Sequence, residues 1–321
     1  MKSYLKQLIR KGVSKLVGIE DFPRLLKDLK HLSETFDPTN ARMLFNEIAS
    51  SNQGIQQLLH HAHRQPCSQR NLLDRLGSAG FRCFSQSDED GLLLYIFSLV
   101  GTTNKRVVEI CAGDGIECNA SNLIINHGWA GLLFDGSEQN IATGQRFYAR
   151  RRDTFSRPPE LVHAWITAEN VNSLIADHRF DGEIDLLSLD LDGMDYWVWK
   201  ALTCIRPRVV ILEFTALWGP HRAVTLPYQP DFHINWERQP WCHGASLPAF
   251  VQLGRERGYR LVGTNRFGFN AIFLRTDLGE NLLPEVSPVD CFEQTPTLRH
   301  WSPDWLPSRE DRPEWWDVVE V

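Results

Sequence analysis

Residues 106–137 constrain the fold of this chain more than any other stretch. They read RVVEICAGDGIECNASNLIINHGWAGLLFDGS. An apolar run ends in Glu109, a turn containing Gly113 and Gly115 follows, and after a helix-like segment a second apolar run ends in Asp135. Strand, glycine-bearing loop, helix and strand in this order form the first half of a doubly wound sheet, in which ligands bind at the carboxyl ends of the strands.

The details of the turn indicate which ligand it suits. Glycines let the backbone approach a ligand closely, and an acidic side chain at a strand end can accept hydrogen bonds from ribose hydroxyls. A dinucleotide site needs the third glycine of G-x-G-x-x-G, but Glu117 and Cys118 occupy that neighbourhood. The turn therefore favours a nucleoside without a pyrophosphate, and the alternative is an ordinary βα turn that binds no ligand.

A second acidic stretch lies near the middle of the chain. The apolar run Ile184–Leu189 is typical of a central parallel strand buried on both faces, and it leads into Asp190, Asp192 and Asp195. Carboxylates crowded at the carboxyl end of a strand repel one another, which raises at least one pKa and is expected only where a proton, a metal or a cationic group shares the site. This is the strongest catalytic signal in the sequence, and a solvated acidic turn that caps the next helix is the alternative.

The remaining periodic segments predict a mostly parallel, seven-stranded, doubly wound α/β sheet. We expect a helical N-terminal extension over residues 1–80, an α/β domain over 81–278 and an irregular, tryptophan-rich arm over 279–321. The further strands are expected at Leu161–Ile166, Ile184–Leu189, Pro207–Phe214, Tyr259–Gly263 and Ala271–Arg275.

Four segments within about residues 84–278 resemble S-adenosylmethionine-dependent methyltransferases. The turn from Glu109 to Gly115, followed by Asp135, is similar to motif I of that family, although Cys111 stands where the motif has its first glycine. The polar segment Ser85–Gly91 and the block Asp190–Trp197 resemble the FkbM-like branch. The resemblance implies a Rossmann-like methyltransferase fold finished by an antiparallel strand pair, and a polar segment that closes over the cofactor.

The resemblance also implies roles for individual residues. Asp190 and Asp192 would help to remove a proton from the acceptor, and His221 is a further catalytic candidate because it follows closely on the fifth predicted strand. The residues expected to hold S-adenosylmethionine are Glu109, Gly113, Asp114, Gly115, Asp135, Gly136, Trp165, Ile166, Thr167 and Asp190.

Whether a metal takes part stays open at this point. Asp190, Asp192 and Glu213 offer only oxygen ligands, which suit Mg²⁺ or Mn²⁺ as in the magnesium-dependent O-methyltransferases. In the competing interpretation one aspartate acts directly as the general base.

Residues 215–246 are too long for an ordinary connection and are expected to select the acceptor. The aromatic side chains there are suited to stacking on sugar rings, which favours a small-molecule or glycan acceptor. They are Trp218, Tyr228, Phe232, Trp236 and Trp241.

Composition excludes several other classes of function. A net charge of -6 argues against a general nucleic-acid binder, and seven cysteines without a C-x-x-C pair argue against a disulfide scaffold or a zinc knuckle. With no apolar run long enough to span a bilayer and no signal-peptide block, we expect a cytoplasmic protein. The basic amphipathic helix predicted at the start would pack on its own domain or on a second copy of the chain; the alternative is peripheral contact with the inner face of a membrane.

The sequence thus predicts an S-adenosylmethionine-dependent O-methyltransferase acting on a hydroxyl group, with a saccharide or glycoconjugate as the expected acceptor. The alternative is a non-catalytic module of the same fold that binds a nucleoside or a partner protein, which Cys111 in a glycine position would favour.

Overall fold

The computed structural model describes residues 52–64, 72–234, 244–306 and 308–321. The chain divides into two units, Met1–Gln57 and Leu58–Val321, and the larger unit contains the sheet and every site discussed below. The predicted basic N-terminal helix, Trp236 and Trp241 lie outside the described residues. Among the described helices, none is both long and apolar enough to cross a bilayer.

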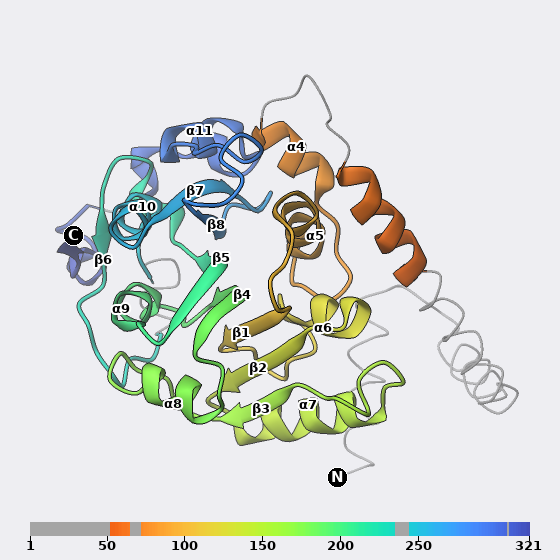
Figure 1. Cartoon of the computed structure of the whole chain (residues 1–321). Helices are drawn as coiled ribbons and strands as arrows, with labels where there is room; N and C mark the ends of the chain where they lie inside the picture. Colours follow the sequence, from red (N-terminus) through yellow and green to blue (C-terminus); the bar gives the residue numbers. More distant parts are fainter. Residues whose placement is uncertain (1–51, 65–71, 235–243, 307) are drawn as a thin grey trace, which may run out of the picture. The chain divides into compact units, whose positions relative to one another are not determined.

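Seven strands form the central sheet in the order β3-β2-β1-β4-β5-β8-β7 (Figure 1). Every pairing is parallel except the two that β8 makes, with β5 and with β7. This is the Rossmann-like methyltransferase fold, and the predicted antiparallel finishing pair is confirmed. The strands are β1 (Arg106–Ile110), β2 (Ala130–Asp135), β3 (Glu160–His163), β4 (Gly182–Leu189), β5 (Ile205–Glu213), β7 (Tyr259–Thr264) and β8 (Asn270–Arg275).

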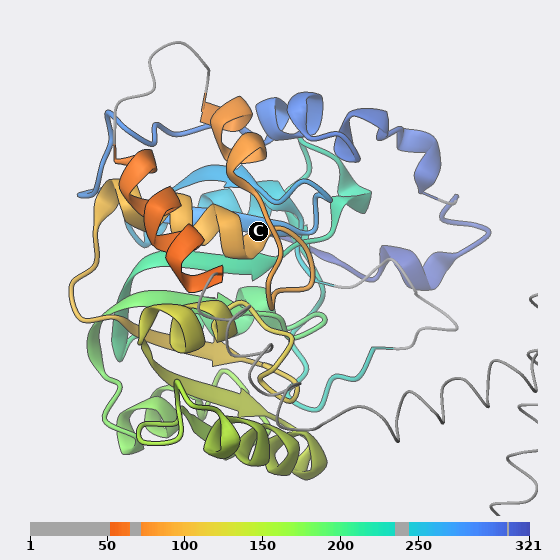
Figure 2. The same cartoon turned by 90° about the vertical axis from the view of Figure 1, so that its right-hand side faces the viewer.

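Helices cover both faces of the sheet (Figures 1 and 2). Residues of α4 to α7 pack in one core cluster, and residues of α8 to α11 pack in the other. The helix α4 belongs to the larger unit, so the boundary predicted near residue 80 falls inside that unit. The helices are α4 (Leu72–Ala79), α5 (Glu89–Val100), α6 (Ser121–His127), α7 (Glu138–Arg150), α8 (Val171–Asp177), α9 (Asp195–Ala201), α10 (Leu247–Glu256) and α11 (Pro288–Gln294).

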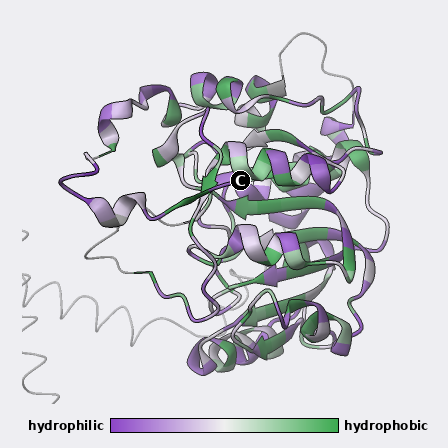
Figure 3. Cartoon of the chain, turned by 90° about the vertical axis from the view of Figure 1, so that its left-hand side faces the viewer, coloured by the Kyte–Doolittle hydropathy of each residue, from purple (hydrophilic) through white to green (hydrophobic). Residues whose placement is uncertain are grey.

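The continuous apolar runs of the strands explain why both faces are covered. Successive side chains of a strand point to opposite faces, and here both sets are apolar. Val107 contributes to one core cluster and Val108 to the other, and both are fully buried. The strands are accordingly green in the hydropathy view, while the helices that flank them carry purple segments (Figure 3). The functional residues must therefore lie at the strand ends.

The tryptophan-rich C-terminal arm returns to the loop that follows β5. Its last strand, β9 (Val319–Glu320), pairs antiparallel with β6 (Val224–Thr225) in a second, two-stranded sheet. Trp316 lies edge-on to Trp218, with ring centroids 5.5 Å apart. The sequence left open whether this arm covers its own domain or a partner, and the structure shows that it packs on its own domain.

Candidate active site

Strand register aligns four potentially functional side chains along one edge of the sheet. The pairing of β1 with β2 and β4, and of β4 with β5, brings the ends of these strands to one level. Neighbouring strands lie about 4.8 Å apart, so the first and third of the four backbones are separated by about 10 Å across the second. In spatial order the residues at this level are Asp135, Cys111, Asp190 and Glu213.

Asp135 at the end of β2 keeps one carboxylate oxygen available. Its Oδ1 accepts hydrogen bonds from the backbone N–H of Ser137 (2.9 Å) and from Nδ2 of Asn140 (3.0 Å). Among the described residues, none donates to Oδ2. The next residue, Gly136, lies against the ring of Trp165, where an added Cβ would approach Cε3 to 3.0 Å. A fixed carboxylate with a free acceptor is thus combined with a flat aromatic surface.

The glycine loop after β1 leaves room above the sheet. Gly113 has a φ of 58°, and an added Cβ there would meet nothing within 4 Å. Gly115, with a φ of 68°, packs closely on Leu133 instead. Asp114 accepts a hydrogen bond from the backbone of Ile116 at 2.9 Å, so this side chain stabilises the turn.

Cys111 occupies the middle of this edge. Its φ of 61° is a left-handed conformation that glycine adopts more easily, in keeping with its place in the motif. Burial raises the pKa of the thiol, and the charges of four surrounding carboxylates raise it further; these are Asp195, Asp190, Asp135 and Asp192. The thiol therefore remains protonated. The four carboxylates that act on it belong to the ends of β2 and β4 and the loop after β4.

Glu109, predicted to hold the cofactor, lies in β1 and is engaged by donors of the protein. The side chain is only 5% exposed. Its two oxygens accept hydrogen bonds from the backbone N–H groups of Asn119 (3.0 Å) and Ala120 (2.7 Å), and Ser188 donates a third at 3.0 Å. The carboxylate is thus engaged by donors at the start of α6, so this geometry favours support of the loop over direct contact with a cofactor.

Asp195 fixes the loop after β4. Its Oδ1 accepts a hydrogen bond from the N–H of Leu191 (2.8 Å), and its Oδ2 accepts one from the N–H of Gly193 (3.2 Å). Burial raises its pKa to about 6. Between these anchors Asp192 adopts a φ of 51° and is exposed. The loop is therefore held so that Asp190 and Asp192 lie at its open side.

Three carboxylates meet beside β5. One oxygen from each of Asp190, Asp192 and Glu213 lies within 4.8 Å of the others. Burial raises the pKa of Asp190 well above its usual value, and the charge of Glu213 adds to this. Burial, with the charges of Asp195 and Asp192, raises the pKa of Glu213 to about 8. Because like charges at this spacing repel, the arrangement favours a proton or a cation shared between Asp190 and Glu213.

The same three carboxylates fit a divalent cation. They provide only oxygen donors, and mutual repulsion of the kind seen here is relieved by Mg²⁺ or Mn²⁺ as well as by a proton. The donor set thus supports both interpretations raised by the sequence.

A segment of the long loop packs on the loops that follow β3 and β4, and we call residues 226–233 the strap. The carbonyl of Leu226 accepts a hydrogen bond from Trp197 Nε1 at 2.8 Å, and that of Pro230 accepts one from Trp165 Nε1 at 2.8 Å. The ring of Phe232 lies directly on Gly193. The strap therefore connects the loops that follow β3 and β4.

Among the residues predicted to contact adenine, Trp165 is 47% exposed and pairs with the ring of His233, with centroids 4.7 Å apart. Ile166 is buried in the core beneath it, and the N–H of Thr167 donates to Asn170 Oδ1 at 2.8 Å. Only Trp165 presents a ring surface to a ligand.

Other predicted residues do not join the carboxylates. His221 is exposed, and among the described residues it is not part of the group formed by Asp190, Asp192 and Glu213. Trp218, expected to stack on a sugar, is 3% exposed and lies in the core under Trp316 and the guanidinium of Arg222. Tyr228 donates its hydroxyl hydrogen to Glu169 and stabilises the strap.

The polar segment Ser85–Gly91 is mostly buried at the start of α5. Asp90 Oδ2 accepts hydrogen bonds from three backbone N–H groups, those of residues 83, 84 and 85. Glu89 Oε1 accepts from the side-chain amides of Asn265 (2.7 Å) and Asn270 (3.0 Å). The carboxylates of this segment therefore join α5 to the turn between β7 and β8.

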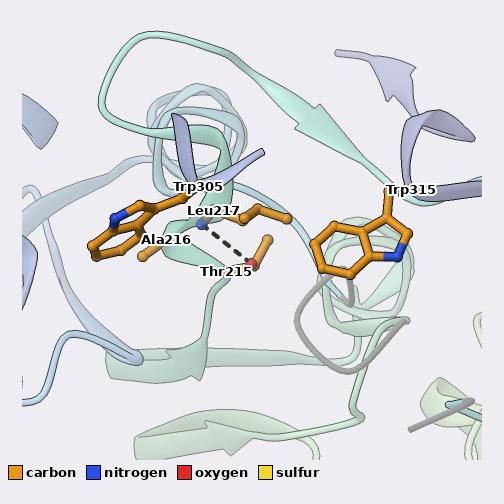
Figure 4. Close-up of a pocket in the computed structure, with 5 residues that line it drawn as sticks. All are labelled: Thr215, Ala216, Leu217, Trp305 and Trp315. Carbon is orange, nitrogen blue, oxygen red and sulfur yellow. Dashed lines mark hydrogen bonds between the residues drawn. The ribbon is translucent and has the colours of Figure 1, made fainter. Parts of the chain in front are cut away.

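A cavity of about 480 Å³ lies beside the end of β5, and sequence reasoning did not find it (Figure 4). The tryptophan-rich composition of the arm was the available signal, but composition alone does not pair the arm with β5. The cavity is lined by Thr215, Ala216, Leu217, Trp305 and Trp315.

Comparison with known proteins gives similarities of fold only. No family model matches the chain, and no curated protein does so. Among solved structures, the glycopeptide N-methyltransferase MtfA in complex with S-adenosyl-L-homocysteine has a TM-score of 0.36 at 13% identity, over 62% of this chain and 94% of that one.

The methyltransferase domain of bacterial CtHen1-C gives a TM-score of 0.36 at 16% identity, over 53% of this chain and 89% of that one. Magnesium protoporphyrin IX methyltransferase (ChlM) from Synechocystis PCC 6803, with bound SAM, has a TM-score of 0.32 at 16% identity, over 53% of this chain and 69% of that one. Similarity at this level says nothing about what this chain binds.

Proposed function

We propose that this chain is an S-adenosylmethionine-dependent methyltransferase that transfers a methyl group to a hydroxyl oxygen. The observation that carries the proposal is the alignment of Asp135, Cys111, Asp190 and Glu213 at one level of four adjacent parallel strands. The distance of about 10 Å between the backbones of Asp135 and Asp190, across that of Cys111, is comparable with the length of a nucleoside lying over the strand ends, where ligands bind in sheets of this kind.

The chemistry of this edge suits a cofactor that is cationic and carries no phosphate. Asp135 Oδ2 is placed to accept from ribose hydroxyls, and Trp165 offers a flat surface next to it. Asp190 and Asp192 bring negative charge to the side of this edge that lies beyond Cys111. A pyrophosphate would be repelled by these carboxylates, so a dinucleotide suits this site poorly.

Proton removal is assigned to the carboxylates beside β5. When bound, S-adenosylmethionine supplies a methyl group activated by a sulfonium sulfur. Asp190, with Glu213 as its proton-sharing partner, would accept the proton that the acceptor hydroxyl loses as its oxygen bonds to the methyl carbon; the methyl–sulfur bond would break, and S-adenosylhomocysteine would leave. The loop fixed by Asp195 and the strap above it hold the acceptor oxygen in line, which is the larger contribution to rate. The exposed His221 has no place in this assignment.

A divalent ion is the alternative to direct proton removal by Asp190. Asp190, Asp192 and Glu213 would hold Mg²⁺ or Mn²⁺, which would make the acceptor hydroxyl more acidic. A relation to the FkbM-like branch, and with it a saccharide acceptor, is supported by the segments Ser85–Gly91 and Asp190–Trp197.

Isothermal titration calorimetry tests the proposal. We expect S-adenosylmethionine and S-adenosylhomocysteine each to bind once per chain, and NAD⁺ to give no heat. Titrations with EDTA and with added Mg²⁺ show whether a metal is needed for binding. If neither adenosyl ligand gives heat under either condition, the enzyme assignment is wrong; if NAD⁺ alone binds, the site is a dehydrogenase site.

A further inference from the structure

We infer that the cavity between the end of β5 and the C-terminal arm holds the methyl acceptor, and that this acceptor is an uncharged molecule with one flat apolar ring face and a hydroxyl group. The inference rests on the proposed function for the identity of the reaction. It goes further because it assigns a wall of the acceptor site to the arm and restricts the charge of the acceptor.

The cavity is directly connected to the carboxylates through the chain. Thr215 follows Glu213 by two residues in extended backbone, with φ -93° and ψ 125°. Side chains two apart on an extended segment point to the same side, at a spacing of about 7 Å. Thr215 lines the cavity, so we expect the Glu213 side chain on the same side of the chain, about 7 Å from that of Thr215. A ring in the cavity can therefore place a substituent next to the proton-accepting pair.

Contacts of the arm hold the tryptophan wall in place. Trp301 Nε1 donates to the carbonyl of Leu217 at 3.1 Å, and the ring of Trp301 covers Gly219. Further along, Trp316 packs on Trp218, and β9 pairs with β6. Trp305 and Trp315 lie between these anchors, and Figure 4 shows their rings on either side of Ala216 and Leu217. The contacts of Trp301 on one side and those of Trp316 and β9 on the other therefore hold this part of the arm against the domain.

The lining decides what the cavity accepts. None of the five described residues that line it carries a charge, and two of them present indole rings. Indole faces and aliphatic side chains bind flat apolar surfaces, such as the C–H face of a pyranose or a phenol ring. A volume of about 480 Å³ is within the range of small-molecule sites. The carboxylates at the edge disfavour an acceptor that carries a phosphate or a carboxylate.

Saturation-transfer difference NMR on the full chain with saturating S-adenosylhomocysteine tests the inference. The neutral probes are methyl β-D-glucopyranoside and 4-methylphenol, which separate the two sources of a hydroxylated ring. Their anionic counterparts are methyl β-D-glucuronide and 4-hydroxybenzoate. The variants are Trp305→Ala, Trp315→Ala and the conservative Trp305→Phe. The matched control is Phe155→Ala, since Phe155 is also an exposed aromatic residue (62%) but does not line the cavity.

We expect at least one neutral probe to bind, with at least 10-fold weaker binding of its anionic counterpart. Trp305→Ala and Trp315→Ala should each weaken binding at least 5-fold, with partial recovery in Trp305→Phe and no change in Phe155→Ala. Binding of neither neutral ring, equal binding of the anionic probes, or unchanged binding in both tryptophan variants would overturn the inference.

The inference about the cavity and the proposed function can be contradicted independently of each other. Calorimetry with S-adenosylhomocysteine on the same variants reports on the cofactor site alone, and we expect its affinity to remain within 2-fold of the wild type. If rings bind but S-adenosylhomocysteine does not, the cavity is a binding site and the methyltransferase assignment is wrong. If the cofactor binds and the rings do not, the acceptor lies elsewhere.

Discussion

Two acid-rich regions lie at the same edge of this sheet and differ in what faces their carboxylates. In the segment Ser85–Gly91, Glu89 and Asp90 are buried against amide N–H groups of the protein. In the cluster beside β5, Asp190 and Glu213 face each other. Burial raises the pKa of Asp90 as well as those of Asp190 and Glu213, but backbone donors oppose the shift at Asp90, whereas the charges of neighbouring carboxylates add to it at Asp190 and Glu213. The first arrangement stabilises the fold, whereas the second destabilises it until a proton, a cation or a substrate shares the site.

The same comparison distinguishes the role of Glu109 from that of Asp135, although both residues lie near the carboxyl ends of strands in the same motif. Glu109 uses both oxygens on protein donors, and Asp135 uses only Oδ1. Acidity at a strand end is therefore not enough to identify a binding residue. The number of protein donors that reach the carboxylate decides its role.

The largest effect should come from the repelling cluster. Asp190→Asn removes the proton acceptor, so we expect the rate of methyl transfer to the ring probes to fall by about 10²–10⁴-fold. Formation of S-adenosylhomocysteine measures the rate. The melting temperature should remain the same or rise, because a like charge is removed. Loss of the fold in this variant would show that Asp190 resembles Asp90 and would contradict the comparison.

The next largest effect should come from the segment Ser85–Gly91, where Asp90 Oδ2 accepts three backbone hydrogen bonds. Asp90→Ala leaves three backbone N–H groups without their acceptor, so we expect a loss of about 2–4 kcal/mol in the free energy of unfolding. Urea titration measures this loss. The control is Glu117→Gln, which removes an exposed ion pair with Arg82 and should cost less than about 1 kcal/mol. Equal stability of the two variants would show that the hydrogen bonds to Asp90 stabilise the fold no more than an exposed ion pair does.

Asp135→Asn should weaken binding without affecting the fold. An amide cannot reproduce the charged acceptor offered to ribose hydroxyls, so we expect the Kd of S-adenosylhomocysteine to rise by about 10–100-fold. Calorimetry gives this value. Glu109→Gln should lower the melting temperature instead, because it disturbs the start of α6. A reversal of these two phenotypes would mean that Glu109, not Asp135, contacts the cofactor.

The smallest effect should be in the pH dependence of stability. A carboxyl group whose pKa is raised in the folded state favours folding while protonated and loses this contribution as pH rises through the folded pKa. Asp195 at about 6 and Glu213 at about 8 therefore predict that stability in EDTA falls between about pH 5 and pH 9.

Glu213→Gln should flatten that decline and raise the melting temperature at pH 8.5 by about 2–4 °C. Thermal melts at a series of pH values show this directly. A wild-type protein that becomes steadily more stable up to pH 9 would be inconsistent with a proton-sharing pair.

The architecture could be read from the sequence because it depends on apolar runs. Each predicted strand is found within three residues of its bounds. The alternation of helices and strands predicts a mostly parallel sheet but does not fix the strand order, which only the structure shows. The third strand is the poorest match: it ends at His163 instead of Ile166, which places Trp165 in the loop.

The site could be predicted only in part. Strand ends place Asp135 and Asp190 at one edge, since parallel strands have their carboxyl ends together. The engagement of Glu109, the burial of Trp218 and the cavity wall formed by Trp305 depend on contacts between segments more than ten residues apart in sequence. Periodicity and motif spacing do not contain that information.

A crystal structure of the full chain with S-adenosylhomocysteine tests the central claim most directly. The account predicts one ligand at the level of Cys111, with a ribose hydroxyl about 2.5–3.0 Å from Asp135 and the sulfur on the side of Asp190. Continuous ligand density elsewhere on the protein, or an empty edge at saturating ligand, would contradict it.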